Sequence, residues 1–160
     1  MIKHDMQHQA HDIFWWNAKV LCGILLIIHF VVGMLCDYPN ALIDFPPLIG
    51  QALALVGGLV FIYHFMLLKK HNNNIGKPSI LLSNKGLFRW IRHPMYFADF
   101  VINAGFMLLH FSAASIIVYA IACYSLCRQA KIEDNYLASL FGEAHGACRK
   151  RSWMLVPFAY

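Results

Sequence analysis

Two segments of the chain carry polar side chains whose types could do chemistry. The first, Lys85–Asp99, reads KGLFRWIRHPMYFAD and places Arg92, His93 and Tyr96 at the start of a strongly apolar stretch. An arginine matches the geometry of a carboxylate, and a histidine can exchange a proton near neutral pH. Asp99 falls inside the apolar stretch, where a charge indicates a function unless it lies close enough to the membrane interface to be wetted. We therefore expect a polar site at the boundary of this stretch.

The second segment, residues 128–157, contains an acidic pair, Glu133 and Asp134. The pair lies on a helical continuation of an apolar stretch, and Phe141–Gly142 should end that helix with the glycine at its cap. The basic cluster Arg149–Arg151 follows, and binding of lipid headgroups is the simpler interpretation of that cluster. Taken singly, these signals do not identify a reaction.

The elements that must position these residues are those of a membrane protein. Of the 160 residues, 59% are hydrophobic and 13% are charged, and the mean hydropathy is +0.53. Soluble domains are about 45–50% apolar and about 25% charged, so this composition excludes a soluble, disordered or coiled-coil chain. The length and the lack of a linker rich in Gly, Ser or Pro predict one domain, residues 1–160. The net charge of +5 does not indicate nucleic-acid binding, because no basic–aromatic module accompanies it.

Four apolar stretches predict an all-α integral membrane protein with four transmembrane helices. A spanning helix needs about 17–25 residues, so the first and third stretches are short. The fourth should continue as a helix beyond the membrane as far as Leu140, and the third and fourth should form a tight hairpin. The stretches are Val20–Cys36, which could begin at Ile13, then Leu48–Leu68, Tyr96–Phe111 and Ser112–Cys127.

The positive charges predict the orientation of the chain. All 13 lysines and arginines lie before the first stretch, between the second and third, or after the fourth. The loop 37–47 and the turn 110–115 contain none. Because cytoplasmic loops carry an excess of Lys and Arg, both termini, the middle loop and the two polar segments should face the cytoplasm.

Histidines and cysteines elsewhere in the chain have simple structural interpretations. The N-terminal segment 1–18 has three histidines at helical spacing followed by aromatic residues. A shared metal ion is conceivable there, but an amphipathic helix at the membrane interface is favoured. The five cysteines include no CxxC pair, so they indicate neither a zinc site nor a disulfide framework, and we predict no metal site. The three histidines are His4, His8 and His11.

Together, the two polar segments resemble a known family pattern. RHPMY at Arg92–Tyr96, two closely spaced apolar stretches and then IEDNYLASLFGEAHGACRKRSWMLVPF are similar to the isoprenylcysteine carboxyl methyltransferase and phospholipid methyltransferase superfamily of integral membrane enzymes. That family typically shows a glycine shortly before RHPxYxG, then EExxL, then FGxEYxxYxxxVPxxxP. The resemblance covers residues 83–158. Besides RHPMY, the matching positions are Gly86, Glu133, Asp134, Leu137, Phe141, Gly142 and Pro157.

The chain departs from this pattern at several positions. Ala98 replaces a glycine, and Asp134 replaces a glutamate while preserving its charge. The loss of two tyrosines near the C-terminus bears on the identity of the acceptor more than on the fold or the cofactor. In place of Glu, two Tyr and Val-Pro, the chain has Ala144, His145, Cys148 and Ser152–Trp153.

The resemblance implies methyl transfer that depends on S-adenosylmethionine, with the cofactor in a cytoplasm-facing pocket and a lipophilic acceptor entering from the bilayer. Arg92 or His93 would bind the methionyl carboxylate, and Glu133 would receive the α-amino group or a ribose hydroxyl. Tyr96 offers a π-face to the sulfonium. Asp134 would assist or would only complete a salt-bridge network. The candidate catalytic residues are Arg92, His93 and Glu133, and the candidate cofactor-binding residues are Gly86, Arg92, His93, Tyr96, Glu133, Asp134 and His145.

The acceptor stays open among prenylated protein C-termini, phosphatidylethanolamine and small apolar thiols or quinol-like molecules. Two other functions are alternatives. Membrane reductases that use NADPH share a related C-terminal half, but they are much longer and have more spans. A non-catalytic membrane scaffold with a degenerate cofactor site is the other alternative. Binding of NADPH, of S-adenosylmethionine or of neither would separate the three.

Overall fold

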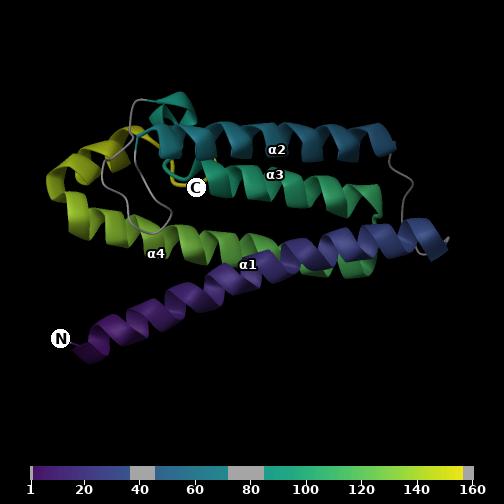
Figure 1. Cartoon of the computed structure of the whole chain (residues 1–160), viewed down its shortest axis with the longest axis horizontal. Coiled ribbons are helices and arrows are strands. Elements are labelled where there is room, and N and C mark those ends of the chain that lie inside the picture. The colour runs from purple at the N-terminus through teal and green to yellow at the C-terminus, as the bar shows by residue number, and fades with distance from the viewer. Residues whose placement is uncertain (1, 37–45, 72–84, 157–160) are drawn as a thin grey trace. The chain divides into compact units, whose positions relative to one another are not determined.

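The computed structural model describes residues 2–36, 46–71 and 85–156, with side chains from residue 13 onward. Within these residues no strand forms, and an isolated parallel bridge pairs Ile91 with Trp153. The predicted all-α fold is therefore confirmed. Its elements are the helices α1 (Ile2–Cys36), α2 (Pro47–Lys70), α3 (Pro94–Leu109) and α4 (Ala113–Arg151) and the short 3-10 helix η1 (Gly86–Arg89) (Figure 1).

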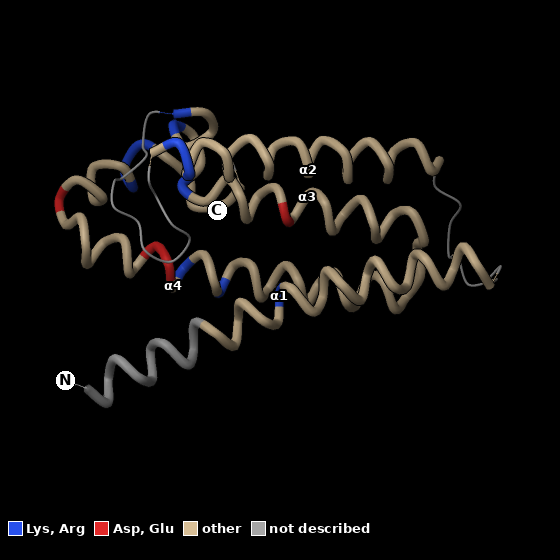
Figure 2. Tube along the Cα trace, in the orientation of Figure 1, with Lys and Arg blue, Asp and Glu red and all other residues tan. Residues whose placement is uncertain are grey.

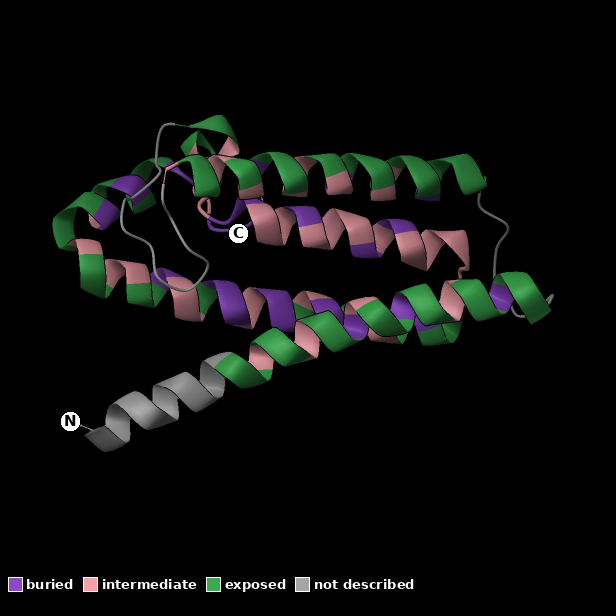
Figure 3. Cartoon of the chain, viewed as in Figure 1, coloured by how far each residue is buried: buried purple, intermediate pink, exposed green. Residues whose placement is uncertain are grey.

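Among the described helices, three are long and apolar enough to cross a membrane: Ile13–Cys36 of α1, Pro47–Lys70 and Ala113–Arg151. In the most apolar part of Ile13–Cys36 only 17% of the residues are buried inside the structure, and in that of Pro47–Lys70 only 11% are buried. From Ile13 onward most residues of α1 are exposed, as are most residues of α2 (Figure 3), and the large exposed side chains on them are mainly Ile, Leu and Val. Such an apolar surface indicates contact with lipid, as expected for a multi-pass membrane protein.

The third apolar stretch forms a shorter helix. α3 has 16 residues, which corresponds to about 24 Å at 1.5 Å per residue. The hydrocarbon core of a bilayer is about 30 Å thick, so α3 reaches across it only with help from flanking residues or local thinning. Four transmembrane helices thus stay a prediction, while three candidate spans and one shorter apolar helix are observed.

The helices contribute to two compact units, of which the first contains Met1–Val56 and Phe100–Gln129. Inside this unit α2 and α3 approach closely at Gly105. A Cβ atom at Gly105 would lie 2.6 Å from the backbone nitrogen of Ala54 and 2.7 Å from the carbonyl oxygen of Gly50. Because these contacts are backbone atoms, only glycine permits this separation of the two helices.

The predicted tight turn between the third and fourth apolar stretches also lies in the first unit. The backbone N–H of Ser115 donates to Ser112 Oγ at 3.1 Å, and the N–H of Ser112 donates to Ser115 Oγ at 2.9 Å. This reciprocal capping satisfies amides that the start of α4 would leave unpaired. His29 Nε2 of α1 lies 2.8 Å from Ser112 Oγ, so α1 contacts the turn directly.

The second unit contains Gly57–Asp99 and Ala130–Tyr160, and a break in α4 shapes it. Gly142 has φ +50° and ψ −122°, a conformation that favours glycine. The sequence predicted the end of the helix here. Instead the chain bends at Gly142 and resumes a helix as far as Arg151 (Figure 1), because the segment after the bend buries one face. That face carries His145 and Cys148, which are 1% and 3% exposed.

The described basic residues of the second unit lie at the end of α2, in and beside η1, and on α4 at Lys131 and in its last turn (Figure 2). These are the parts that the positive-inside rule assigns to the cytoplasm. The sidedness of the chain stays a prediction.

Candidate active site

The two polar segments of the sequence are joined through their backbones in the second unit. The N–H of Arg92 donates to the carbonyl of Trp153 at 2.9 Å, and the N–H of His93 donates to the carbonyl of Met154 at 3.1 Å. The N–H of Trp153 donates in return to the carbonyl of Trp90 at 3.0 Å. The RHPMY segment is therefore held against the C-terminal segment before any side chain contributes.

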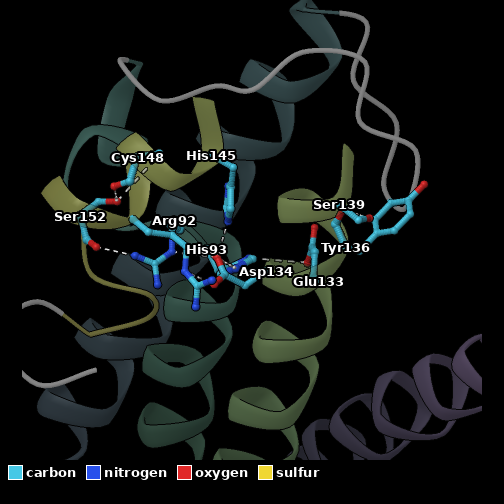
Figure 4. A network of polar contacts seen from close by, with 10 residues as sticks. Arg92, His93, Glu133, Asp134, Tyr136, Ser139, His145, Cys148 and Ser152 are labelled. Atoms are coloured by element: carbon cyan, nitrogen blue, oxygen red, sulfur yellow. Dashed lines mark hydrogen bonds and ion pairs between the residues drawn. The ribbon is translucent and has the colours of Figure 1, made fainter. Parts of the chain in front are cut away.

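Asp134 is the centre of the side-chain network (Figure 4). Its side chain is 1% exposed, and its Oδ1 accepts from Arg92 Nε at 2.8 Å and from His145 Nε2 at 3.0 Å. Its Oδ2 lies 3.3 Å from Arg149 Nε. Arg92 also donates through Nη1 to the carbonyl of Ser152. One buried carboxylate thus binds side chains from the segment just before α3 and from the helical segment after Gly142.

His93 lies between the two acidic residues. Its Nδ1 is 3.6 Å from Glu133 Oε2, and its Nε2 is 3.7 Å from Asp134 Oδ1. The imidazole stacks on Tyr96, with ring centroids 5.6 Å apart and planes inclined by 18°. Both carboxylates stand at ion-pair distance, which favours the protonated imidazole.

The charges of this network shift the pKa of three members, which lie outside the apolar stretch of α4. Burial raises the pKa of Asp134, but its contact with His93 and the charges of Arg92, His93 and His145 outweigh burial and hold the pKa well below its usual value. Burial lowers the pKa of His93, but Asp134 and Glu133 outweigh it and the net pKa is raised. The pKa of His145 is lowered, because burial and the nearby cations Arg92 and Arg149 outweigh Asp134.

Two imidazole nitrogens in this network are buried and lack a hydrogen-bond partner among the described residues: His93 Nε2 and His145 Nδ1. Because Asp134 only accepts, His145 Nε2 must donate to it, and the Nδ1 of a neutral His145 is then an acceptor. The Nε2 of a protonated His93 is instead a donor. The network therefore holds one buried donor and one buried acceptor that make no hydrogen bond among the described residues.

An open cavity of about 350 Å³ adjoins the network. Ligand pockets typically occupy about 300–1,000 Å³, so the volume of this cavity lies near the lower end of that range. Three of the lining side chains are cationic and one is anionic, which favours a ligand group with negative charge. The lining residues are Arg92, Lys131, Asp134, Arg149, Ser152, Trp153 and Met154.

The structure brings together most of the residues that the sequence predicted as a site. Arg92, His93, Glu133, Asp134 and His145 share the network, and Tyr96 stacks on one of its members. Gly86 is placed differently: it lies against α2, where a Cβ atom would be 2.9 Å from Tyr63 and 3.0 Å from His64. The side chains of His4, His8 and His11 lie outside the described residues.

Sequence reasoning missed Arg149, Ser152 and Trp153 as parts of the site. Arg149 belonged to a basic cluster that suggested lipid headgroups, and its partner Asp134 lies 15 residues earlier, across the bend at Gly142. Ser152 contributes a backbone carbonyl, for which no residue type is a signal. The departures from the family pattern at Ser152–Trp153 marked the place but not the role.

Apolar helices with exposed aliphatic surfaces indicate a helical membrane protein, and it carries a buried polar network outside the apolar stretches. Its family follows from comparison with known proteins. The model of the isoprenylcysteine carboxyl methyltransferase (ICMT) family matches residues 49–139, more than half of the chain, so the chain belongs to that family.

A curated relative, "Protein-S-isoprenylcysteine O-methyltransferase" from Dictyostelium discoideum, is 30% identical over 79 residues. These residues are 49% of this chain, and the match spans a third (33%) of the length of the relative. No solved structure matches the chain. The family match contains Arg92, His93, Glu133 and Asp134 and ends before His145.

Proposed function

We propose that this protein transfers a methyl group from S-adenosylmethionine to a lipophilic acceptor of the isoprenylcysteine carboxylate type. The observation that carries the proposal is the convergence of Arg92, His93, Glu133 and Asp134 in one buried network, because all four lie within the ICMT family match. The name of the curated relative supports a prenylated cysteine as acceptor.

The residues of the site fit S-adenosylmethionine by their chemistry. When bound, this cofactor would supply an activated methyl group on a sulfonium, which passes to an acceptor with S-adenosylhomocysteine as the leaving group, so positioning would dominate the catalysis. Arg149 and Lys131 line the cavity and would attract the methionyl carboxylate. Glu133, whose side chain is 35% exposed, would accept from the α-amino group or a ribose hydroxyl.

Arg92 would act at the site mainly by electrostatics and position. Its guanidinium already donates to Asp134 and to the carbonyl of Ser152, so its charge is fixed beside the cavity. His93 Nε2 and His145 Nδ1 would gain hydrogen bonds from a polar cofactor, and an unsatisfied buried polar group otherwise costs about 1–3 kcal/mol. A carboxylate acceptor needs no proton removed, so this assignment requires no general base.

The acceptor would reach the site from the bilayer. Its apolar tail needs no aqueous route, because the helices beside the site expose aliphatic surface. A carboxylate at its end would be drawn toward the cationic lining of the cavity.

The test is a thermal-shift titration of the detergent-purified protein with S-adenosylhomocysteine and, in parallel, with NADPH. A ligand that binds only the folded state raises the melting temperature by mass action. We expect a saturable shift with S-adenosylhomocysteine alone. A shift with NADPH alone would identify a reductase, and a folded sample that responds to neither would favour a scaffold.

A pair of variants links that shift to the proposed site. Glu133→Ala should weaken binding of S-adenosylhomocysteine by about 1.5–3 kcal/mol if one charged hydrogen bond is lost. Glu143→Ala removes an exposed acid on the same helix and should leave the affinity unchanged. Equal affinities in both variants would remove Glu133 from the cofactor site.

A further inference from the structure

A buried histidine of α2 contacts the segment that carries Arg92 and His93. His64 is 1% exposed, and its Nδ1 lies 2.8 Å from the carbonyl oxygen of Val60. Its Nε2 lies 3.0 Å from the backbone nitrogen of Leu87, which donates to it. A carbonyl only accepts and an amide N–H only donates, so Nδ1 carries the proton and Nε2 carries the lone pair. The two partners together select one neutral tautomer of His64.

The turn that His64 holds fits closely against α2. Gly86 has φ +51°, and a Cβ atom there would lie 2.9 Å from the ring of Tyr63 and 3.0 Å from His64 Nε2. Phe88 packs edge-on against the imidazole, with ring centroids 5.6 Å apart. Glycine is therefore needed both for the backbone conformation and for the close approach to His64.

Leu87 transmits this contact to the active site through the backbone. Its N–H is held by His64, while its carbonyl accepts from the N–H of Trp90 at 2.9 Å and of Ile91 at 2.8 Å. Ile91 directly precedes Arg92, whose own N–H is bound to the carbonyl of Trp153. The RHPMY segment is thus fixed from two sides, by α2 through Leu87 and by the C-terminal segment.

We propose that His64 is a positioning residue, whose neutral imidazole fixes the Gly86–Arg89 turn on α2 and thereby sets the placement of Arg92 and His93. The consequence for ligand binding rests on the proposed function. The proposal also gives Gly86 a different role from the one that the sequence suggested. Its part is to bring Leu87 within reach of His64, and direct contact with the cofactor is not required.

The experiment compares three variants of the 160-residue chain in lipid nanodiscs. His64→Phe keeps a planar ring but removes both nitrogens, whereas His64→Gln retains a carbonyl oxygen that can accept from Leu87. His71→Phe is the matched control, because His71 directly follows the same helix and its Nδ1 is 3.0 Å from the carbonyl of Leu67, also four residues earlier. Amide hydrogen exchange over residues 85–92 reports the turn, and titration with S-adenosylhomocysteine reports the site.

We expect His64→Phe to speed exchange at the turn and to weaken S-adenosylhomocysteine binding, each by about tenfold, the effect of losing one buried hydrogen bond. His64→Gln should largely keep both the slow exchange at the turn and the S-adenosylhomocysteine affinity of the wild type. His71→Phe should change neither the exchange nor the affinity. In the wild type, ¹⁵N resonances of His64 should show a protonated Nδ1 and an unprotonated Nε2, and this measurement stands even if His64→Phe does not fold.

Other outcomes would overturn the proposal. A protonated Nε2 in the wild type, or exchange at the turn that is the same in His64→Phe and His71→Phe, would refute the anchoring contact. Faster exchange with unchanged S-adenosylhomocysteine affinity would refute the link to the site while leaving the proposed function intact. A wild type that does not bind S-adenosylhomocysteine would instead overturn the proposed function, and exchange and tautomer would still decide whether His64 anchors the turn.

Discussion

Replacing Asp134 by Asn tests whether one buried carboxylate holds the site together. The substitution keeps the shape of the side chain and removes its charge. Asp134 accepts from Arg92 and His145 at 2.8 and 3.0 Å, and the side chains of these partners are only 9% and 1% exposed. Side chains with so little exposure gain little hydration when the charge is lost, so Arg92 would remain as a largely enclosed cation without its main counter-ion.

The magnitude of the effect follows from these exposures. Breaking a buried ion pair by removing one partner costs about 3–5 kcal/mol. The side chain of Arg149 is 49% exposed, so losing its contact adds little, because exposed pairs contribute about 0–1 kcal/mol. The amide oxygen of Asn still accepts one hydrogen bond, which places the expected loss for Asp134→Asn near the lower limit, about 3 kcal/mol.

The assay is unfolding by sodium dodecyl sulfate in mixed micelles, followed by circular dichroism, with Glu133→Gln as the matched control. The control changes the adjacent acid, whose side chain is 35% exposed and 3.6 Å from His93, so its loss should be below about 1 kcal/mol. If Asp134→Asn were no more destabilising than Glu133→Gln, the network would not be a source of stability and its central role would be refuted.

Further predictions concern pH, helix packing and topology. Because the pKa of Asp134 is lowered in the folded protein, Asp134 stabilises the fold above its unfolded-state pKa of about 3.9, and this stabilisation is lost as pH falls through the folded-state pKa. Because the pKa of His93 is raised, His93 stabilises the fold below its unfolded-state pKa of about 6.5, and this stabilisation is lost as pH rises through the folded-state pKa. Unfolding measured against pH should therefore show the combined contribution of Asp134 and His93 at its largest between those limits, and Asp134→Asn should flatten the acid side. The lowered pKa of His145 acts in the opposite direction below about pH 6.5. Gly105→Ala should destabilise the packing of α2 on α3 by about 1–3 kcal/mol in the same detergent assay, because backbone atoms cannot yield, whereas Gly58→Ala, with open space around it, should not; equal effects would show that the close approach is unimportant. A cysteine introduced in the loop 37–47 should be labelled by an impermeant reagent only from the non-cytoplasmic side, and labelling only from the cytoplasm would reverse the topology.

The sequence by itself determined the class of this protein and the outline of its helices. Long apolar runs are decided by local composition, since any segment of that kind leaves water whatever its neighbours are. The turn at Ser112 and the break at Gly142 are also decided locally, because serine capping and the conformational freedom of glycine act within a few residues. The course of the chain after Gly142 was wrong in the sequence prediction, because a further helical segment depends on what it buries.

Only the tertiary structure decided how the site residues divide their roles. Within the acidic pair, Glu133 and Asp134 look equivalent in sequence, yet one side chain is 35% exposed and the other is 1% exposed at the centre of the network. Arg92 lies 42 residues from Asp134, and His64 lies 23 residues from Leu87. Periodicity and motif spacing describe neighbours along one helix, whereas these contacts depend on where separate elements meet. Burial and hydrogen-bond partners depend on this tertiary packing. They determine which of two similar carboxylates is held charged inside the fold.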